Sequence, residues 1–268
     1  MATDYQHSIR RRALEILGEQ ESDVGDQLYR TLRLLARYRS TLVANTLFAR
    51  GGDKVRSGPF AGLAVPRQSA EGCLAPKVLG TYESELHPVI EHVAARGYRT
   101  VVNIGSAEGY YAVGLALRLP QATIRAYDID DNARRMTREL AEHHGVGDRV
   151  VVGGEFAHAD FQALDPETSF VFCDIEGAEV DLIDPSRAPN LARLDMLVEL
   201  HNLPDIPTYQ RFMARFRDSH RLAVIEAGSR DIRAFPELRD LEHLDQLLAF
   251  WEWRRGPTPW LMMSAIRS

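Results

Sequence analysis

Four polar residues stand at or just beyond the ends of two apolar, strand-like runs of this chain. Asp174 and Glu176 follow the first run, and Glu199 and His201 close the second. Ligands of open α/β sheets bind outside the carboxyl ends of the strands, so we expect these side chains to gather at one edge. Residues two apart on a strand share a face, and Glu199 and His201 are therefore expected on the same side.

Carboxylates that gather without a basic partner raise one another's pKa values unless a cation lies between them. The local sequence around Asp174 and Glu199 supplies no such partner. We therefore predict a divalent metal held by Asp174, Glu199 and His201, and this oxygen-rich set suits Mg²⁺ or Mn²⁺ better than zinc. A metal at this edge would lower the pKa of a substrate hydroxyl.

His201 is also a candidate general base, because an imidazole titrates near neutral pH. The alternative is that His201 only ends a strand and hydrogen-bonds a loop carbonyl. Asp174 and His201 are accordingly the predicted catalytic residues.

A glycine-bounded turn is the strongest feature of the middle of the chain. The apolar run 101–104 predicts a strand, Gly105 and Gly109 bound a tight turn, and a helix is expected from Tyr110 onward. Such a turn presents backbone N–H groups at a helix N-terminus and allows a ligand to approach where a glycine lacks Cβ. An ordinary strand–helix turn is the alternative.

The next predicted strand, 123–127, ends in Asp128, about 20 residues beyond the glycine turn. Nucleotide-binding sheets place a carboxylate there to bind a ribose diol. The turn has only two glycines, whereas a dinucleotide site favours G-x-G-x-x-G. This difference argues against NAD and for S-adenosylmethionine, which has no pyrophosphate.

After a third predicted strand, 149–152, the chain continues into Glu155 and Phe156. We expect this loop to flank the base of a nucleoside, with Phe156 stacked on it and a polar group binding the exocyclic amine. Upstream, Thr81 is predicted to cap a helix that ends at Gly97, which leaves Tyr82 near the amino acid portion of the ligand.

Three segments together resemble class I S-adenosylmethionine-dependent methyltransferases of the FkbM-like group. They are VVNIGSAEGYYAVGLA followed by the acidic strand end at Asp128, then CDIEGAEVDLI, and then LVELHN, and the resemblance spans about Lys77 to Asn202. Members of that group methylate mainly hydroxyl oxygens on sugars, glycans and natural-product scaffolds. Some similar sugar methyltransferases use Mg²⁺.

The resemblance also assigns roles by position. Asp128 and its neighbour Ile129 would contact the ribose, Glu155 and Phe156 the adenine, and Asp174 both cofactor and metal. The methionine part would be held by Gly105, Ser106, Glu108, Gly109 and Tyr110. Tyr82, from its place in the chain, and Asn103, whose amide can accept from the ammonium, are also predicted to bind the cofactor. In two places the chain departs from the pattern: Asn103 stands where an acid is usual, and Gly177 where some metal-dependent relatives have a histidine base.

Composition predicts a globular, cytoplasmic protein. The chain has 268 residues, 45% of them hydrophobic, with a net charge of −6 that gives no general reason to expect a nucleic acid partner. No run of 18 apolar residues predicts a membrane span. The two cysteines, Cys73 and Cys173, have no metal or redox spacing and are expected to be reduced and buried.

The predicted fold is α/β: a Rossmann-like class I methyltransferase domain over 76–268, with a seven-stranded, mostly parallel sheet and helices on both faces. Residues 1–75 form a helical appendage and connector. Arg30, Arg33 and Arg37 make a basic stripe there, which we interpret as a solvated face. The leucines of the appendage are expected to dock either on its own sheet or on another subunit.

The sequence thus predicts an enzyme that transfers a methyl group from S-adenosylmethionine to a hydroxyl of a small molecule or glycan, with Mg²⁺ or Mn²⁺. Two alternatives remain: an NAD-linked oxidoreductase, and a non-catalytic module that binds S-adenosylmethionine. Asn103 is the residue that keeps the second alternative open, because its amide supplies no charge to the ligand's ammonium.

Overall fold

The computed structural model describes residues 3–20, 22–67, 72–201, 206–256 and 258–267 of the chain. Asn202, the last residue of the segment that carries the resemblance, lies outside the described residues. Within them, no helix is long and apolar enough to cross a membrane.

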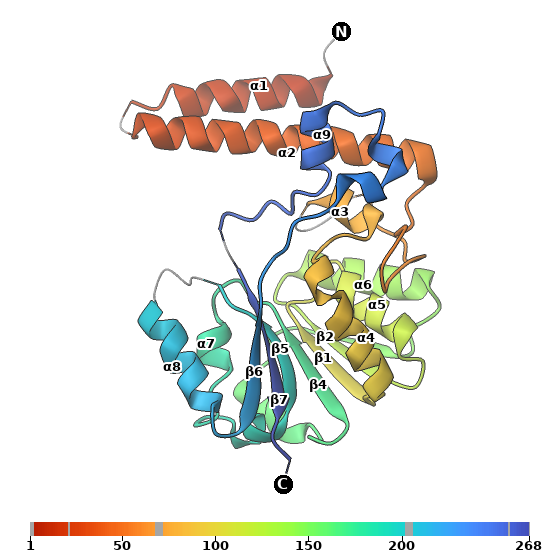
Figure 1. Cartoon of the computed structure of the whole chain (residues 1–268), viewed down its shortest axis with the longest axis vertical. Helices are drawn as coiled ribbons and strands as arrows, with labels where there is room; N and C mark the ends of the chain where they lie inside the picture. Colours follow the sequence, from red (N-terminus) through yellow and green to blue (C-terminus); the bar gives the residue numbers. More distant parts are fainter. Residues whose placement is uncertain (1–2, 21, 68–71, 202–205, 257, 268) are drawn as a thin grey trace.

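The described residues form one seven-stranded sheet with the strand order β3-β2-β1-β4-β5-β7-β6 (Figure 1). Strand β7 is antiparallel to β5 and β6, and the other neighbouring pairs are parallel. The predicted fold class is confirmed. The strands are β1 (Thr100–Ile104), β2 (Thr123–Tyr127), β3 (Val150–Gly153), β4 (Ser169–Cys173), β5 (Asp195–Glu199), β6 (His220–Ile225) and β7 (Trp260–Ala265).

Alternate residues of the central strands enter two separate apolar cores, one on each face of the sheet. Val101 packs with α4 (His87–Arg96), α5 (Tyr110–Arg118) and α6 (Asp131–His143). Val102, by contrast, packs with α7 (Glu179–Leu182) and α8 (Ile206–Phe216). Short 3₁₀ turns complete the connections: η1 (Ser84–Leu86), η2 (His158–Ala163), η3 (Pro189–Arg193), η4 (Ile232–Ala234) and η5 (Pro236–Leu238).

The chain reverses its direction across the sheet between β1 and β4. From β1 it proceeds outward to β2 and β3, and then returns to β4 on the other side of β1. Open α/β sheets bind their ligands outside the carboxyl ends of the strands at such a switch point. The predicted site residues after β1, β2 and β4 therefore lie at the expected edge.

One helix begins later than predicted. Thr81 does not cap α4; instead Glu83 adopts a left-handed conformation with φ +46°, a 3₁₀ turn follows, and α4 begins at His87 with Pro88 in its first turn. Proline is favoured at the start of a helix because it lacks an N–H to pair. The apolar pattern thus predicts the body and the end of this helix correctly, but the predicted start at Thr81 is wrong.

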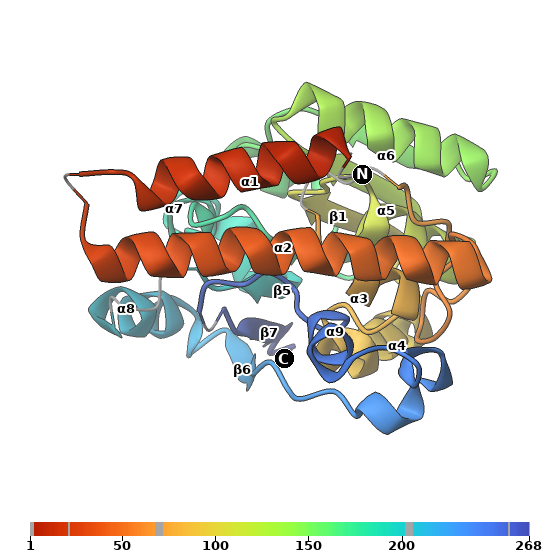
Figure 2. The same cartoon turned by 90° about the horizontal axis from the view of Figure 1, so that it is seen from above.

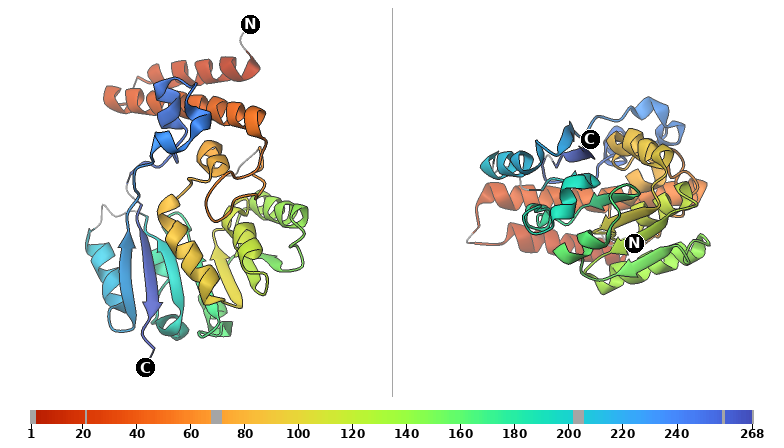
Figure 3. Two further views of the ribbon diagram at one scale, coloured as in Figure 1. Left: turned by 45° about the vertical axis from the view of Figure 1, so that its right-hand side comes forward. Right: turned by 90° about the horizontal axis from the view of Figure 1, so that it is seen from below.

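The N-terminal appendage is a helical hairpin, α1 (Asp4–Leu17) and α2 (Val24–Gly51), that lies across the carboxyl edge of the sheet (Figures 1 and 2). Helix α3 (Leu74–Leu79) lies between the hairpin and the sheet, and α9 (His243–Leu248) packs on α2 (Figure 3). Leu47 and Phe48 belong to the same core as Val101. The boundary at residues 75 and 76 stays a prediction.

The arginine stripe of α2 is not the solvated face we expected. Arg30 pairs with Glu19 of the hairpin at 2.6 Å. Arg33 donates hydrogen bonds to the backbone carbonyls of Trp253 and Arg254, at 2.6 and 3.0 Å, and the guanidinium of Arg37 lies 4.9 Å from the Trp253 ring centroid. Arg33 and Arg37 therefore hold the hairpin against the segment before β7, while Arg30 pairs within the hairpin.

The connector also docks on the sheet domain through a histidine that should make stability depend on pH. The backbone N–H of Ala64 donates to Nε2 of His144 at 2.9 Å, so this bond needs a neutral ring. Burial, with the charges of His143 and Lys54, lowers the pKa of His144 below its ordinary value of 6.5. Below that pH the unfolded chain binds more protons, so the folded state loses stability as the pH falls.

We therefore expect His144→Gln, whose amide oxygen can still accept from Ala64, to lose less stability than the wild type between pH 7.5 and 5.5. Urea unfolding at the two pH values measures the difference, and His92→Gln, at an exposed histidine of α4, is the matched control. Equal losses in the wild type and His144→Gln would show that this bond does not titrate.

Candidate functional site

A cavity of about 640 Å³ opens at the carboxyl edge of the sheet. It lies beyond the ends of β1 to β4, and its volume is in the range of sites for small molecules. The predicted residues among those that line it are Gly105, Asp128, Ile129, Glu155, Phe156 and Asp174.

Asp128 is held rigidly at this cavity by two backbone donors. The N–H of Ala107, in the glycine turn, donates to Oδ2 at 2.8 Å, and the N–H of Asp130 donates to Oδ1 at 2.9 Å. Each carboxylate oxygen can accept a further bond. Asp128 can therefore present a fixed pair of acceptors to a diol in the cavity. Its neighbour Ile129 is 82% exposed at the rim.

Position 105 requires glycine because of a neighbouring strand, and not because a ligand approaches there as we expected. Gly105 has φ +80°, and a Cβ there would lie 1.6 Å from the backbone oxygen of Asp174. The missing side chain therefore admits the neighbouring strand end, not a ligand. Gly109 has φ +92°, and its Cβ would lie 3.1 Å from Cα of Thr137.

Phe156 forms one wall of the cavity. Its ring is 6% exposed and packs edge-on against Tyr127, with ring centroids 4.9 Å apart, and against Phe161. Glu155 is exposed beside it. Phe156 and the exposed Glu155 thus both border the cavity.

Two buried polar side chains near the turn have no hydrogen-bond partner among the described residues. They are the amide of Asn103, at both its nitrogen and its oxygen, and the hydroxyl of Ser106. Buried polar atoms are seldom left in that state, because each lost bond costs free energy. Neither residue is among those that line the cavity, although their chain neighbours Ile104, Gly105 and Ala107 are. A polar ligand group that reached past this lining to the end of β1 would satisfy both residues.

Three further predicted residues lie in a buried aromatic cluster and are not among those that line the cavity. Nζ of Lys77 lies 4.7 Å from the ring centroid of Tyr82 and 5.7 Å from that of Tyr110. The same ammonium pairs with the carboxylate of Glu108, and both side chains are 2% exposed. Burial raises the pKa of Tyr110, so its hydroxyl stays protonated and its ring packs in the cluster.

The four polar residues of the strand ends do come together. Cys173 of β4 pairs with Val198 of β5, so Asp174 and Glu199 leave the sheet side by side. Nε2 of His201 lies 3.4 Å from Oε2 of Glu199, 3.5 Å from Oε2 of Glu176 and 3.8 Å from Oδ1 of Asp174. One ring nitrogen thus faces three carboxylates.

Glu179 orients His201, and sequence reasoning gave it no role. Its carboxylate is 1% exposed, and Oε1 accepts from the N–H groups of Ile175 and Gly177 and lies 2.9 Å from Nδ1 of His201. Burial alone would raise the pKa of Glu179, but the bond with His201 and the backbone donors lower it. Nδ1–H donates to this carboxylate, which directs Nε2 at the cluster.

The surrounding carboxylates also raise the pKa of His201. Burial alone would lower the pKa of His201, but the bond with Glu179 and the charge of Glu199 outweigh it, so the pKa is raised. Donor atoms of Asp174, Glu179 and His201 all lie within 4.8 Å of one another, a grouping that could hold a metal ion.

Glu199 has the basic partner that its local sequence lacks. Arg254 donates to Glu199 and to Glu83, and its Nε lies 3.1 Å from Oε2 of Glu252. Burial alone would lower the pKa of Arg254, but the carboxylates raise it. Only one oxygen of Glu199 therefore remains directed at His201.

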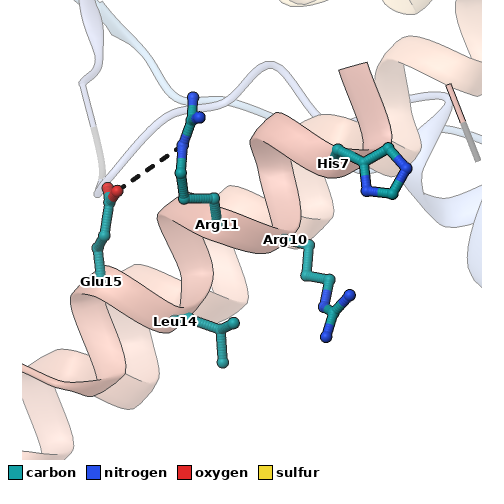
Figure 4. Close-up of a pocket in the computed structure, with 5 residues that line it drawn as sticks. All are labelled: His7, Arg10, Arg11, Leu14 and Glu15. Atoms are coloured by element: carbon teal, nitrogen blue, oxygen red, sulfur yellow. Dashed lines mark ion pairs between the residues drawn. The ribbon is translucent and has the colours of Figure 1, made fainter. Parts of the chain in front are cut away.

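A second hollow lies on the surface of α1 (Figure 4). It is lined by His7, Arg10, Arg11, Leu14 and Glu15, and Arg11 pairs with Glu15 at 3.8 Å. None of the predicted site residues belongs to it. We therefore take the cavity at the sheet edge as the candidate active site.

Comparison with known proteins gives one informative match. No family model matches the chain. Over 106 residues the chain is 34% identical to the release factor glutamine methyltransferase of Chlorobaculum tepidum, an alignment that covers 38% of this chain. The aligned part spans about a third of the length of that curated relative, 33%.

Solved structures of methyltransferases are more distantly similar. An O-methyltransferase from Bacillus cereus with bound SAH gives a TM-score of 0.48 at 14% identity, covering 69% of this chain and 81% of that one. TomG, an O-methyltransferase from Streptomyces achromogenes, gives 0.47 at 16% identity, covering 85% and 89%. Since both TM-scores are below 0.5, nothing about function follows from these likenesses.

Proposed function

We propose that this chain transfers a methyl group from S-adenosylmethionine to a hydroxyl oxygen of a sugar, glycan or natural-product scaffold. Asp128 carries the proposal: two backbone donors fix its carboxylate at the rim of a cavity of suitable size, after the second strand of the sheet. The match to a glutamine methyltransferase over 106 residues supports methyl transfer in general and not the choice of oxygen as the acceptor atom. The FkbM-like subgroup and the acceptor rest on the resemblance of the sequence.

The buried polar atoms at the end of β1 fit the methionine part of this cofactor. Its ammonium could donate to the amide oxygen of Asn103, and its carboxylate could accept from Ser106. Asp128 would bind the ribose diol, with Phe156 and Glu155 beside the adenine. The cofactor supplies the electrophilic methyl group, and these residues would bind and orient it.

Replacing Asp128 with Ala is expected to weaken binding of S-adenosylhomocysteine about 30-fold. Two ribose hydrogen bonds would be lost, which costs about 2 kcal/mol. Calorimetric titration measures the affinity, with the exposed Asp148→Ala as the matched control. An affinity unchanged in Asp128→Ala would remove Asp128 from the cofactor site.

We infer that a divalent cation binds at Asp174, Glu199 and His201. Glu179 holds Nδ1 of His201, and Nε2 lies 3.8 Å from Oδ1 of Asp174 and 3.4 Å from Oε2 of Glu199. Ligating histidines commonly donate their other N–H to a carboxylate in this way. The donor atoms that lie within 4.8 Å of one another are those of Asp174, Glu179 and His201, so Glu199 would complete the set only by moving closer to Asp174. The cation would lower the pKa of the acceptor hydroxyl, while Asp174 and Glu199 would fix its position.

His201 as general base is the competing role for the same atom. Nε2 can hold either a proton or a metal, so the two roles exclude each other. In the second role Nε2 takes the hydroxyl proton, and Glu179 stabilises the imidazolium that forms. A titration with Mn²⁺ distinguishes them, because only the first role requires binding.

Methylation of an amide nitrogen is a second candidate, favoured by the match to a glutamine methyltransferase. The lone pair of an amide nitrogen is delocalised into its carbonyl, which makes it a weak nucleophile, whereas Nε2 of His201 is placed to take a proton from a hydroxyl. Assays with glutamine peptides and with polyhydroxylated acceptors discriminate the two. The alternative of an NAD-linked oxidoreductase is supported only by the strand–turn–helix geometry, which binding sites for many different cofactors share.

A further inference from the structure

The helical hairpin carries an apolar surface that the described part of the chain leaves uncovered. Leu28 is 59% exposed, Leu32 64% and Leu14 60%. We call the whole set the hairpin surface; its members are Leu14, Leu17, Val24, Leu28, Leu32 and Leu35. Contiguous exposed apolar side chains on a protein surface mark interaction sites.

Spacing places the α2 members of the hairpin surface on one stripe. Val24, Leu28, Leu32 and Leu35 recur at intervals of four, four and three residues, which is the period of one helix face. The other faces of this half of α2 are occupied. Gln27 and Thr31 are buried, and Arg33 and Arg37 contact the segment before β7.

The position of the surface leaves it accessible. The second half of α2 packs into the core through residues such as Leu47, whereas the first half runs out to the tip of the hairpin at the border of the molecule (Figures 1 and 2). The described part of the chain thus contacts this half of α2 on its other faces and leaves the stripe of the hairpin surface exposed.

Charges beside the surface are arranged in blocks of opposite sign. Arg10, Arg11 and Arg12 are exposed on α1, and the acidic residues Asp23 and Asp26 are exposed at the tip. Two of these charges also have a partner within the hairpin, Arg11 with Glu15 at 3.8 Å and Asp26 with Arg30 at 3.4 Å. An anionic membrane or a nucleic acid would favour a uniformly basic face, and the acidic tip opposes both. A second hairpin, laid antiparallel on the first, would set the acidic tip of each against the arginines of the other.

We propose that the hairpin surface binds the hairpin of a second copy of this chain, in a twofold symmetric dimer. A twofold contact uses the same patch on both subunits, so each block of charge meets its opposite twice. The leucines would form the apolar centre of a four-helix arrangement, and the charges would set its antiparallel direction. This contact is independent of the proposed catalytic activity.

Sedimentation equilibrium between about 1 and 100 µM tests the dimer. We expect twice the monomer mass of 30.2 kDa for the wild type and 30.2 kDa for Leu28→Ser/Leu32→Ser. The matched control is Leu244→Ser/Leu247→Ser, whose leucines are 61% and 49% exposed on α9; it should stay dimeric. Circular dichroism checks that each variant is folded.

Charge reversal tests the antiparallel direction. Arg11→Glu and Asp26→Arg should each weaken the dimer at least 10-fold, and a chain carrying both changes should regain it. A wild type that stays at 30.2 kDa throughout, or a Leu28→Ser/Leu32→Ser variant that still dimerises, would overturn the proposal. A monomer that binds anionic vesicles would overturn it in favour of a membrane.

Discussion

Replacing Asp174 with Asn is expected to abolish detectable Mn²⁺ binding and to lower turnover with it. Asp174 contributes Oδ1 to the cluster around Nε2 of His201, at 3.8 Å from that nitrogen. Loss of a residue that merely orients a ligand costs about 10- to 100-fold in metal affinity, so loss of a direct ligand should cost at least about 100-fold. Asparagine has nearly the same size as aspartate. The expected loss of metal affinity therefore comes from the lost negative charge and from the weaker metal binding of an amide oxygen.

Electron paramagnetic resonance of Mn²⁺ measures this binding without an acceptor substrate. The matched control, Asp218→Asn, changes an aspartate that is 91% exposed and outside the cluster. If Asp174→Asn binds Mn²⁺ as tightly as the wild type, the proposed ligand set is wrong. If the wild type binds none, the metal proposal fails and His201 remains only as a base.

Replacing Arg254 with Met is expected to cost about 3–5 kcal/mol of unfolding free energy. Arg254 is the shared partner of Glu83 and Glu199, which are 1% and 4% exposed. Without the guanidinium of Arg254, the buried carboxylates of Glu83 and Glu199 have no positive charge to balance them. Burying an unbalanced charge is what makes the loss of unfolding free energy large. Burial, with the charge of Glu199, already raises the pKa of Glu83 well above its ordinary value.

Urea unfolding followed by circular dichroism measures this loss. Adding Glu83→Gln to Arg254→Met should restore part of the stability, because one unpaired charge is then removed. The control Arg217→Met changes a side chain that is 74% exposed and should cost no more than about 0.5 kcal/mol. A loss in Arg254→Met below about 1 kcal/mol would contradict the account of this network.

Local sequence rules predicted the residues that follow strands. Asp128, Asp174 and Glu199 each end or follow an apolar run, and the parallel register of the sheet brings such ends to one edge without further information.

Contacts between distant segments could not be predicted in the same way. Arg254 lies 55 residues beyond Glu199 and reaches it only because the segment before β7 folds back over the edge. For Glu179 there was a signal: an acid soon after β4 can meet a histidine just after the neighbouring β5. We missed it because an acid at a helix start is ordinarily explained by the helix dipole.

The central claim is that the cavity beside Asp128 binds S-adenosylmethionine. Its most direct test is calorimetric titration of the metal-free wild-type protein with S-adenosylhomocysteine, with NAD as the comparison ligand. The account predicts binding in the micromolar range for the first ligand and none for NAD. Absence of heat with S-adenosylhomocysteine, or tighter binding of NAD, would contradict it.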